Sequence, residues 1–172
     1  MIQQVVYNSE DIAKFLEVHE NTPEYEYSQT LQKLLSVQDR ISIIADIEQT
    51  ELKIIIDKLK FVKHNFKDYV IKEGEVSKEI FFTLSGEFHV FSENKKIGVI
   101  PSGHSFGETA AIFNTKRNAS VVCASKEATL LSFCINTDAI EFCPTGLSIL
   151  YKNLASQINL KLEEMNNKLI KK

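Results

Sequence analysis

Residues 106–121, which read FGETAAIFNTKRNASV, decide how this chain folds and what it holds. Within them, Gly107 permits close approach of the backbone to a ligand and adopts backbone angles that other residues resist. Residues 108–112 have the small and helix-forming side chains of a single helical turn, and the unpaired N–H groups of a helix start suit an anion. Arg117 follows after a short loop, and its guanidinium group can hold a phosphate through two hydrogen bonds.

Glu108 narrows the class of ligand further. A carboxylate beside a phosphate site repels the ligand unless the carboxylate has a partner of its own. An ionised Glu only accepts hydrogen bonds, and a ribose hydroxyl is a suitable donor. The stretch therefore predicts a site for a sugar phosphate with a free hydroxyl, and the alternative is a turn of a β-barrel in which a surface Arg117 pairs with Glu108.

The stretch resembles the phosphate-binding cassette of cyclic-nucleotide-binding domains, which occur in the bacterial catabolite activator and in the regulatory subunits of protein kinase A. The similarity extends over about residues 41–165 and includes KEGE at 72–75, FTLSG at 82–86 and IGVIPSG at 97–103. It implies an α+β fold, in which an antiparallel β-barrel of the jelly-roll type (a double-stranded β-helix) is flanked by N-terminal helices and a long C-terminal helix. It also implies a cyclic nucleotide ligand, cAMP or cGMP, and no cofactor.

The resemblance assigns roles within the cassette. Gly107, Thr109 and Ala110 would present backbone N–H groups to the cyclic phosphate. Arg117 would pair with the phosphate charge, and Glu108 would accept a hydrogen bond from the ribose hydroxyl. The remaining residues implied in ligand binding are Phe106, Asn118 and Ala119 in the cassette, and Val90 and Ile97, which match positions that line the base and ribose pocket.

Two cassette positions depart from the family pattern. Family members often have Ala, Ser or Thr where this chain has Asn118, directly beside the phosphate and base, and Leu is common where it has Thr109. The larger amide of Asn118 both donates and accepts hydrogen bonds. The sequence therefore does not distinguish cAMP from cGMP.

Composition excludes several classes of protein. The 172 residues are 44% hydrophobic with a net charge of −3, which suits one domain with an extension and argues against a basic DNA-binding surface. The apolar runs are too short to span a bilayer and no signal peptide is evident, so we expect a cytoplasmic protein. Three cysteines, Cys123, Cys134 and Cys143, are interpreted as reduced, packed thiols. Four scattered histidines predict no metal site: His19, His64, His89 and His104. No catalytic arrangement of side chains stands out.

The first sixty residues read as helical. We divide the chain into a helical N-terminal extension, residues 1–40, and a cyclic-nucleotide-binding domain, residues 41–172. One helix is expected to follow Asn8 or Ser9 and to break before Pro23, and a second is expected to begin near Ser28. Residues 41–60 are interpreted as a helix with Thr50 as a possible cap, although the three isoleucines at 54–56 also suit a strand. By resemblance, this helix leads into the barrel.

The barrel is expected over about residues 61–135, where short runs of alternating polar and apolar residues indicate strands and five of the six glycines lie between 74 and 107. C-terminal helices are expected over 136–172. The first is capped by Asn136 or Thr137, residues 144–146 interrupt it, and a long helix with an apolar stripe begins near Leu147. That stripe, like the apolar sides of the N-terminal helices, suits packing on the barrel or a homodimer contact.

Our leading hypothesis is a stand-alone cyclic-nucleotide sensor without enzyme activity, which relays ligand binding through its flanking helices to an unknown downstream protein. We expect the ligand to order residues from about 155 to 172. The alternative is a degenerate fold that acts as a ligand-independent protein-interaction module. A DNA-binding regulator of the catabolite activator class is disfavoured, because no helix-turn-helix segment follows the long helix in this sequence.

Overall fold

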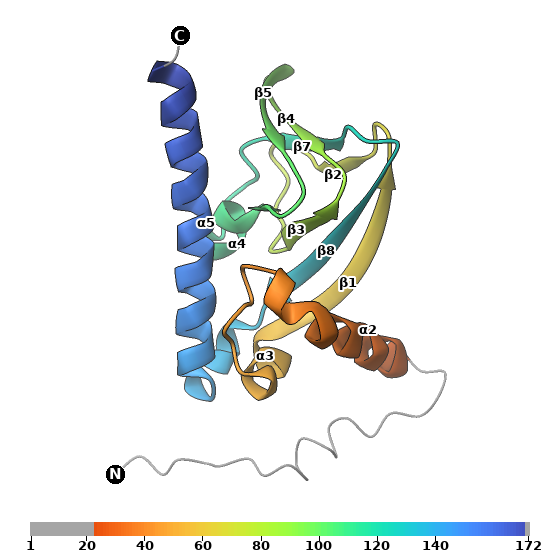
Figure 1. Ribbon diagram of the computed structural model, residues 1–172, viewed down its shortest axis with the longest axis vertical. Helices are drawn as coiled ribbons and strands as arrows, with labels where there is room; N and C mark the ends of the chain where they lie inside the picture. The colour runs from red at the N-terminus through yellow and green to blue at the C-terminus, as the bar shows by residue number, and fades with distance from the viewer. Residues whose placement is uncertain (1–22, 171–172) are drawn as a thin grey trace.

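The computed structural model describes residues 23–170, and the side chains of residues 28–167 and of Ile170 (Figure 1). The helix expected after Asn8 or Ser9 lies outside the described residues. The described chain runs through helices, two β-sheets and a long C-terminal helix, in that order. The α+β class implied by the resemblance is therefore confirmed.

The N-terminal part contains α2 (Pro23–Val37), the 3-10 helix η1 (Gln38–Arg40) and α3 (Gln49–Ile55). Helix α2 begins at Pro23, earlier than the start predicted near Ser28. Proline suits the first helical position, because the N–H group that it lacks would have no intrahelical partner there. Leu31 and Leu34 of α2 are buried.

The prediction of a helix across residues 41–60 is only partly right. Residues 41–48 form an irregular turn. The buried side-chain amide of Gln38 donates to the carbonyl oxygens of Ile44 and Ile47 in this turn, at 3.0 and 2.6 Å. The N-cap of α3 is Glu48 rather than Thr50, and it makes no side-chain cap bond. From Ile56 the backbone is a strand, because pairing with a later strand satisfies its polar groups.

The strands form two four-stranded antiparallel sheets, in the orders β1-β8-β3-β6 and β2-β7-β4-β5. A closed barrel over 61–135 is not confirmed, since no strand pairing joins the two sheets within residues 23–170. The strands are β1 (Ile56–Asn65), β2 (Tyr69–Ile71), β3 (Ile80–Ser85), β4 (Phe88–Ser92), β5 (Lys95–Ile100), β6 (Ser105–Phe106), β7 (Ser120–Cys123) and β8 (Glu127–Ile135). The sheets position the short helix α4 (Glu108–Phe113), which follows β6 directly.

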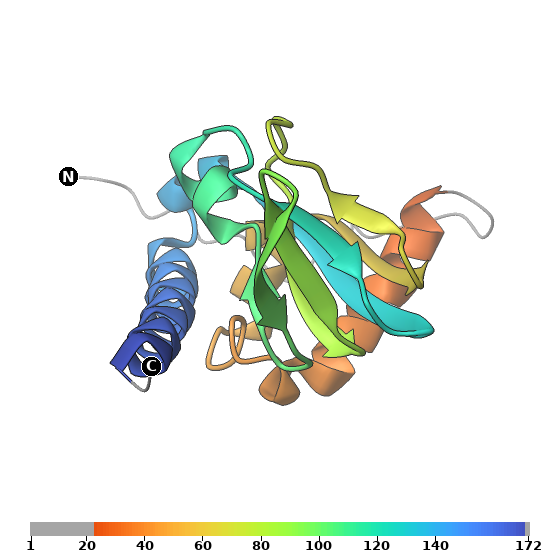
Figure 2. The same ribbon diagram turned by 90° about the horizontal axis from the view of Figure 1, so that it is seen from above.

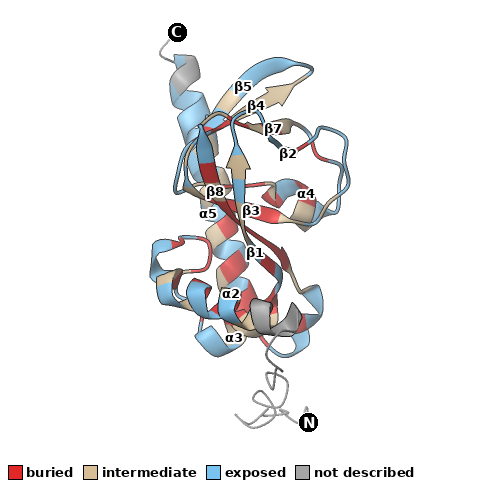
Figure 3. Cartoon of the chain, turned by 90° about the vertical axis from the view of Figure 1, so that its right-hand side faces the viewer, coloured by how far each residue is buried: buried red, intermediate tan, exposed pale blue. Residues whose placement is uncertain are grey.

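Two apolar clusters hold these layers together, and they meet on opposite faces of β3. Phe82 faces a cluster that joins the sheet to helices α2, α3 and the C-terminal helix. Phe81, on the other face, packs with Phe88, Phe106 and Leu130 between the sheets. Figure 3 shows where the buried positions lie along the strands and helices. The prediction of packed thiols is confirmed, since three cysteines are buried: Cys123, Cys134 and Cys143.

The C-terminal part contains the 3-10 helix η2 (Thr137–Glu141) and the long helix α5 (Pro144–Ile170). Asn136 caps η2, as predicted, by accepting a hydrogen bond from the N–H of Asp138. Residues 144–146 are the first turn of α5 rather than an interruption, again because proline suits a helix start.

Helix α5 runs along the side of the molecule, next to α4 (Figures 1 and 2). Only the first half of its apolar stripe is buried, through Leu147, Leu150 and Leu154, while Leu162 and Met165 are more than half exposed. A homodimer contact through the exposed half stays a prediction. None of the helices that the structure describes is both long and apolar enough to cross a membrane.

Candidate ligand-binding site

The cassette turns from a strand into a short helix and back through a loop. Gly107 follows β6 with a φ of 81°, and it precedes the first residue of α4. Its backbone angle lies in the left-handed region that only glycine adopts readily. A Cβ atom at this position would lie 2.7 Å from Nη1 of Arg117 and 3.2 Å from the carbonyl oxygen of Glu79. Glycine is therefore required here both by conformation and by space.

Arg117 lies beneath this turn with a buried side chain, only 4% exposed. Nη1 donates to the carbonyl oxygen of Gly107 at 2.7 Å, and Nη2 donates to that of Glu79 at 2.7 Å. The guanidinium group lies 5.9 Å from the ring centroid of Phe81. Its position is thus fixed by two backbone carbonyl groups and one aromatic ring.

The charge of Arg117 has no ion-pair partner among the side chains that the structure describes. Burial lowers the pKa of Arg117, and the carboxylates of Glu79 and Glu75 act in the opposite direction without contacting it. Because a buried charge is costly unless it is paired, an anion is the partner that this position lacks.

Backbone bonds also fix Arg117 to the turn after β2. The Arg117 N–H donates to the carbonyl oxygen of Glu75 and the Gly74 N–H donates to that of Arg117, each at 2.8 Å. The KEGE motif at residues 72–75 therefore supports the arginine through its backbone, a role that its side-chain identities do not reveal.

Glu108 is the second buried charge of the site, with an exposed fraction of 4%. Its Oε1 accepts a hydrogen bond from Nζ of Lys161 on α5, and the two groups form an ion pair. Three residues farther along α5, Glu164 lies 3.9 Å from Nε2 of His104, which belongs to the loop before β6. The distal half of α5 is thus joined to the cassette by the Lys161–Glu108 pair.

The other predicted residues divide into two groups. Phe106 stacks on Phe81, the ring that also faces Arg117, with centroids 5.1 Å apart, and Ala110 is buried in α4, the helix that begins at Glu108. Thr109 and Asn118 are exposed, and Ala119 is half-buried.

Val90 and Ile97 lie on β4 and β5, outside the cassette. Val90 is half-buried on β4, where it packs against the cluster between the sheets and pairs with Gly98 of β5. Ile97 is 61% exposed and falls at the irregular step between Gly98 and Lys96 in that pairing. A pocket-lining role for Ile97 stays a prediction.

Sequence reasoning missed Lys161, Phe81 and Glu79. A charged residue three positions after Ile158, beside the apolar stripe of α5, was the available signal for Lys161. Glu79 contributes its backbone carbonyl group to Arg117, so no side-chain signal existed for it.

Comparison with known proteins gives the site a context. Residues 62–137 match the family described as cyclic nucleotide-binding domain. The cGMP-dependent protein kinase of Plasmodium berghei is 33% identical over 79 residues, which cover 46% of this chain and 9% of the kinase. This chain spans about a tenth of the length of such curated relatives.

Two solved structures illustrate the shared fold. A cyclic nucleotide-binding domain from Methylobacillus flagellatus kt has a TM-score of 0.65 at 16% identity, with 90% of this chain and 96% of that chain covered. The regulatory subunit of a cAMP-independent protein kinase A from Trypanosoma brucei has a TM-score of 0.60 at 18% identity, with 81% and 50% covered.

The family match covers residues 62–137, and the fold resembles that of the Methylobacillus flagellatus cyclic nucleotide-binding domain. The resemblance stated from the sequence is therefore confirmed. The part of the chain that the structure describes holds no kinase catalytic domain.

Proposed function

We propose that this chain is a sensor that binds cAMP or cGMP at residues 106–121. The observation that carries the proposal is Arg117, a buried cation that the described side chains leave without an ion pair. A guanidinium group has five N–H donors, and two of them are used by backbone carbonyl groups. The remaining donors are free to hold a cyclic phosphate by charge-assisted hydrogen bonds.

The other cassette groups fit the rest of the ligand. The N–H groups of Gly107, Thr109 and Ala110 lie at the start of α4, where helical N–H groups lack intrahelical acceptors. Glu108 would accept a hydrogen bond from the ribose hydroxyl. In this arrangement the phosphate meets the cation and the backbone, and the hydroxyl meets the carboxylate.

Helix α5 is the element through which binding would be relayed. Lys161 occupies an oxygen of Glu108, the group that the ribose would use. A ligand shifts a conformational equilibrium only by its different affinity for the two states. Because ribose and Lys161 compete for one carboxylate, ligand binding would favour the state in which distal α5 leaves the cassette and becomes available to a downstream protein.

Calorimetry of the purified chain with cAMP, cGMP, 5′-AMP and guanosine tests the proposal. We expect a cyclic nucleotide to bind and 5′-AMP and guanosine to bind at least about tenfold more weakly. Arg117→Ala should weaken binding of the cyclic nucleotide by at least about tenfold, since a hydrogen bond to a charged group contributes roughly 1.5–3 kcal/mol. Lys116→Ala removes an exposed neighbouring cation and is the control.

Unchanged affinity in a folded Arg117→Ala variant would refute the site. Because Arg117 also holds two carbonyl groups, circular dichroism must first establish that the variant is folded.

The second candidate function is a ligand-independent interaction module. It is favoured by the pairing of Glu108 with Lys161, which gives the carboxylate a partner within the chain. The Trypanosoma brucei neighbour, described as belonging to a cAMP-independent kinase, is a protein of the same fold. Absence of binding by all four ligands in the calorimetry would support this module over the sensor.

A further inference from the structure

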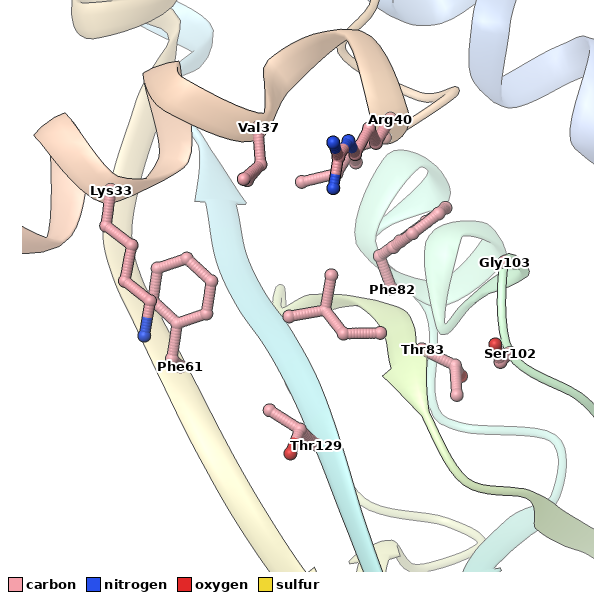
Figure 4. Close-up of a pocket in the computed structure, with 11 residues that line it drawn as sticks. Lys33, Val37, Arg40, Phe61, Phe82, Thr83, Ser102, Gly103 and Thr129 are labelled. Carbon is pink, nitrogen blue, oxygen red and sulfur yellow. The ribbon is translucent and has the colours of Figure 1, made fainter.

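A cavity lies away from the cassette, between α2 with η1 and the face of the sheet that β1, β8 and β3 form (Figure 4). Its volume is about 430 Å³, within the range of sites for small organic ligands. The apolar part of its wall is formed by Val37, Ile41, Phe61, Phe82 and Leu84.

This cavity is separate from the candidate nucleotide site. None of its lining residues belongs to 106–121. Phe82 and Leu84 belong to the helix-side cluster. Phe81, the ring that faces Arg117 of the cassette, belongs to the cluster between the sheets. A ligand here would therefore contact the opposite face of β3.

Two basic side chains lie at the cavity, on different sides of it (Figure 4). Arg40 comes from η1, and Lys33 of α2 lies 4.6 Å from the ring centroid of Phe61. Neither forms an ion pair with the side chains described for residues 28–167. Asp39, the acidic neighbour of Arg40 in sequence, does not line the cavity.

The combination of an apolar wall and cations at the rim selects for one ligand chemistry. The chain as a whole has a net charge of −3, so it does not attract anions in general. An apolar body gains by leaving water, and an acidic group gains from the guanidinium fork of Arg40, which matches a planar carboxylate.

We propose that this cavity binds a small organic anion with a flat aromatic or short hydrocarbon body and a single acidic group. The body lies on Phe61, Phe82 and Leu84, and the acidic group pairs with Arg40. Lys33 adds attraction over a longer distance. Binding at this site does not require cyclic nucleotide binding at the cassette.

Fluorescence titration with 8-anilinonaphthalene-1-sulfonate tests the proposal, and the neutral N-phenyl-1-naphthylamine serves as its uncharged counterpart. We expect saturable binding of the anion by the full chain, unaffected by an excess of cAMP and cGMP. Arg40→Gln should weaken the anion by about fivefold and the neutral dye by less than twofold, because an exposed charge contributes up to about 1 kcal/mol. Lys33→Gln should have a smaller effect than Arg40→Gln.

Two further variants locate the site. Thr129→Phe places a ring in the cavity from β8 and should remove binding of both dyes, while amide NMR spectra establish that the variant is folded. Lys63→Gln removes a cation of β1 that pairs with Glu127 and does not line the cavity, and it should leave both affinities unchanged. In the wild-type chain, amide shifts on adding the anion should gather at residues 33–41, 82–84, 102–103 and 129.

Four results would overturn the proposal. They are the absence of saturable binding, displacement of the anion by cyclic nucleotide, equal affinity of Arg40→Gln and wild type for the anion, and retained binding in folded Thr129→Phe. Each of them leaves the cassette experiments unaffected, because those use Arg117 and nucleotide ligands.

Discussion

The ion pair between Lys161 and Glu108 should contribute measurably to stability. Removing one partner of a fully buried pair costs about 3–5 kcal/mol, and an exposed pair contributes less than about 1 kcal/mol. The Glu108 side chain is 5% exposed and that of Lys161 is 30% exposed, so this pair falls between those limits. We expect Lys161→Met to destabilise the chain by about 1–3 kcal/mol.

Thermal and urea denaturation of wild type, Lys161→Met, Glu108→Gln and the double variant measure this contribution. A loss of about 1–3 kcal/mol corresponds to a fall in Tm of roughly 2–12 °C for a domain of this size. The double-mutant cycle should give a coupling free energy of about 1–2 kcal/mol. Lys152→Met, which removes an exposed cation from the same helix, is the control. A coupling free energy within error of zero would show that the contact does not hold α5.

The same pair determines the expected response of α5 to ligand. The hypothesis that ligand orders residues 155–172 is untested, and since α5 is already helical through Ile170, the change concerns its opening free energy. Under the proposal that ribose displaces Lys161 from Glu108, hydrogen exchange should show rising protection in the cassette and falling protection in residues 157–167. Lys161→Met should bind cyclic nucleotide up to about tenfold more tightly. Unchanged affinity together with unchanged exchange in α5 would refute the competition.

Three other changes test individual groups. Glu108→Gln should weaken a cyclic nucleotide more than its 2′-deoxy analogue in calorimetry, and equal losses would count against the hydroxyl role. Gly107→Ala should lower the free energy of unfolding by about 1–3 kcal/mol. Gly103→Ala is also at positive φ but has open space around the new Cβ, so it should lose less stability. An equal loss of stability would show that the clash with Arg117 contributes nothing. Burial lowers the pKa of His64 below 6.5, with Asp68 opposing, so the unfolded state binds more protons and stability should fall as pH decreases from 6.5 toward the lowered pKa. Denaturation of His64→Gln should show a flatter profile in that window, and an unaltered profile would assign the dependence to other groups.

The cassette could be predicted because its signals are local. The turn needs glycine at 107, and the short helix and the returning arginine follow within a few residues. The end of α3 could not be predicted in the same way. Consecutive isoleucines at 54–56 suit a helix or a strand, and the choice at Ile56 depends on its pairing with Ile135, far away in sequence.

The same reason explains what was missed at the site. Lys161 and Glu108 are 53 positions apart, so only the packing of α5 against the cassette brings them together. The contribution of Glu79 is a backbone carbonyl group, which every residue type has. The barrel was inferred from the clustered glycines and short strands as well as from the resemblance; strand pairing within residues 23–170 gives two four-stranded sheets and does not confirm its closure.

The uneven anchoring of α5 makes the helix a lever arm with its pivot near Leu154. Up to that residue the helix is packed in the core, and Asn153 donates to the carbonyl oxygen of Ala45 at 3.1 Å. At 1.5 Å per residue, the segment from Leu154 to Ile170 extends about 24 Å beyond the pivot. A tilt of about 5° would then move its tip by about 2 Å, so a sub-ångström shift at the cassette would be amplified at the far end of the helix.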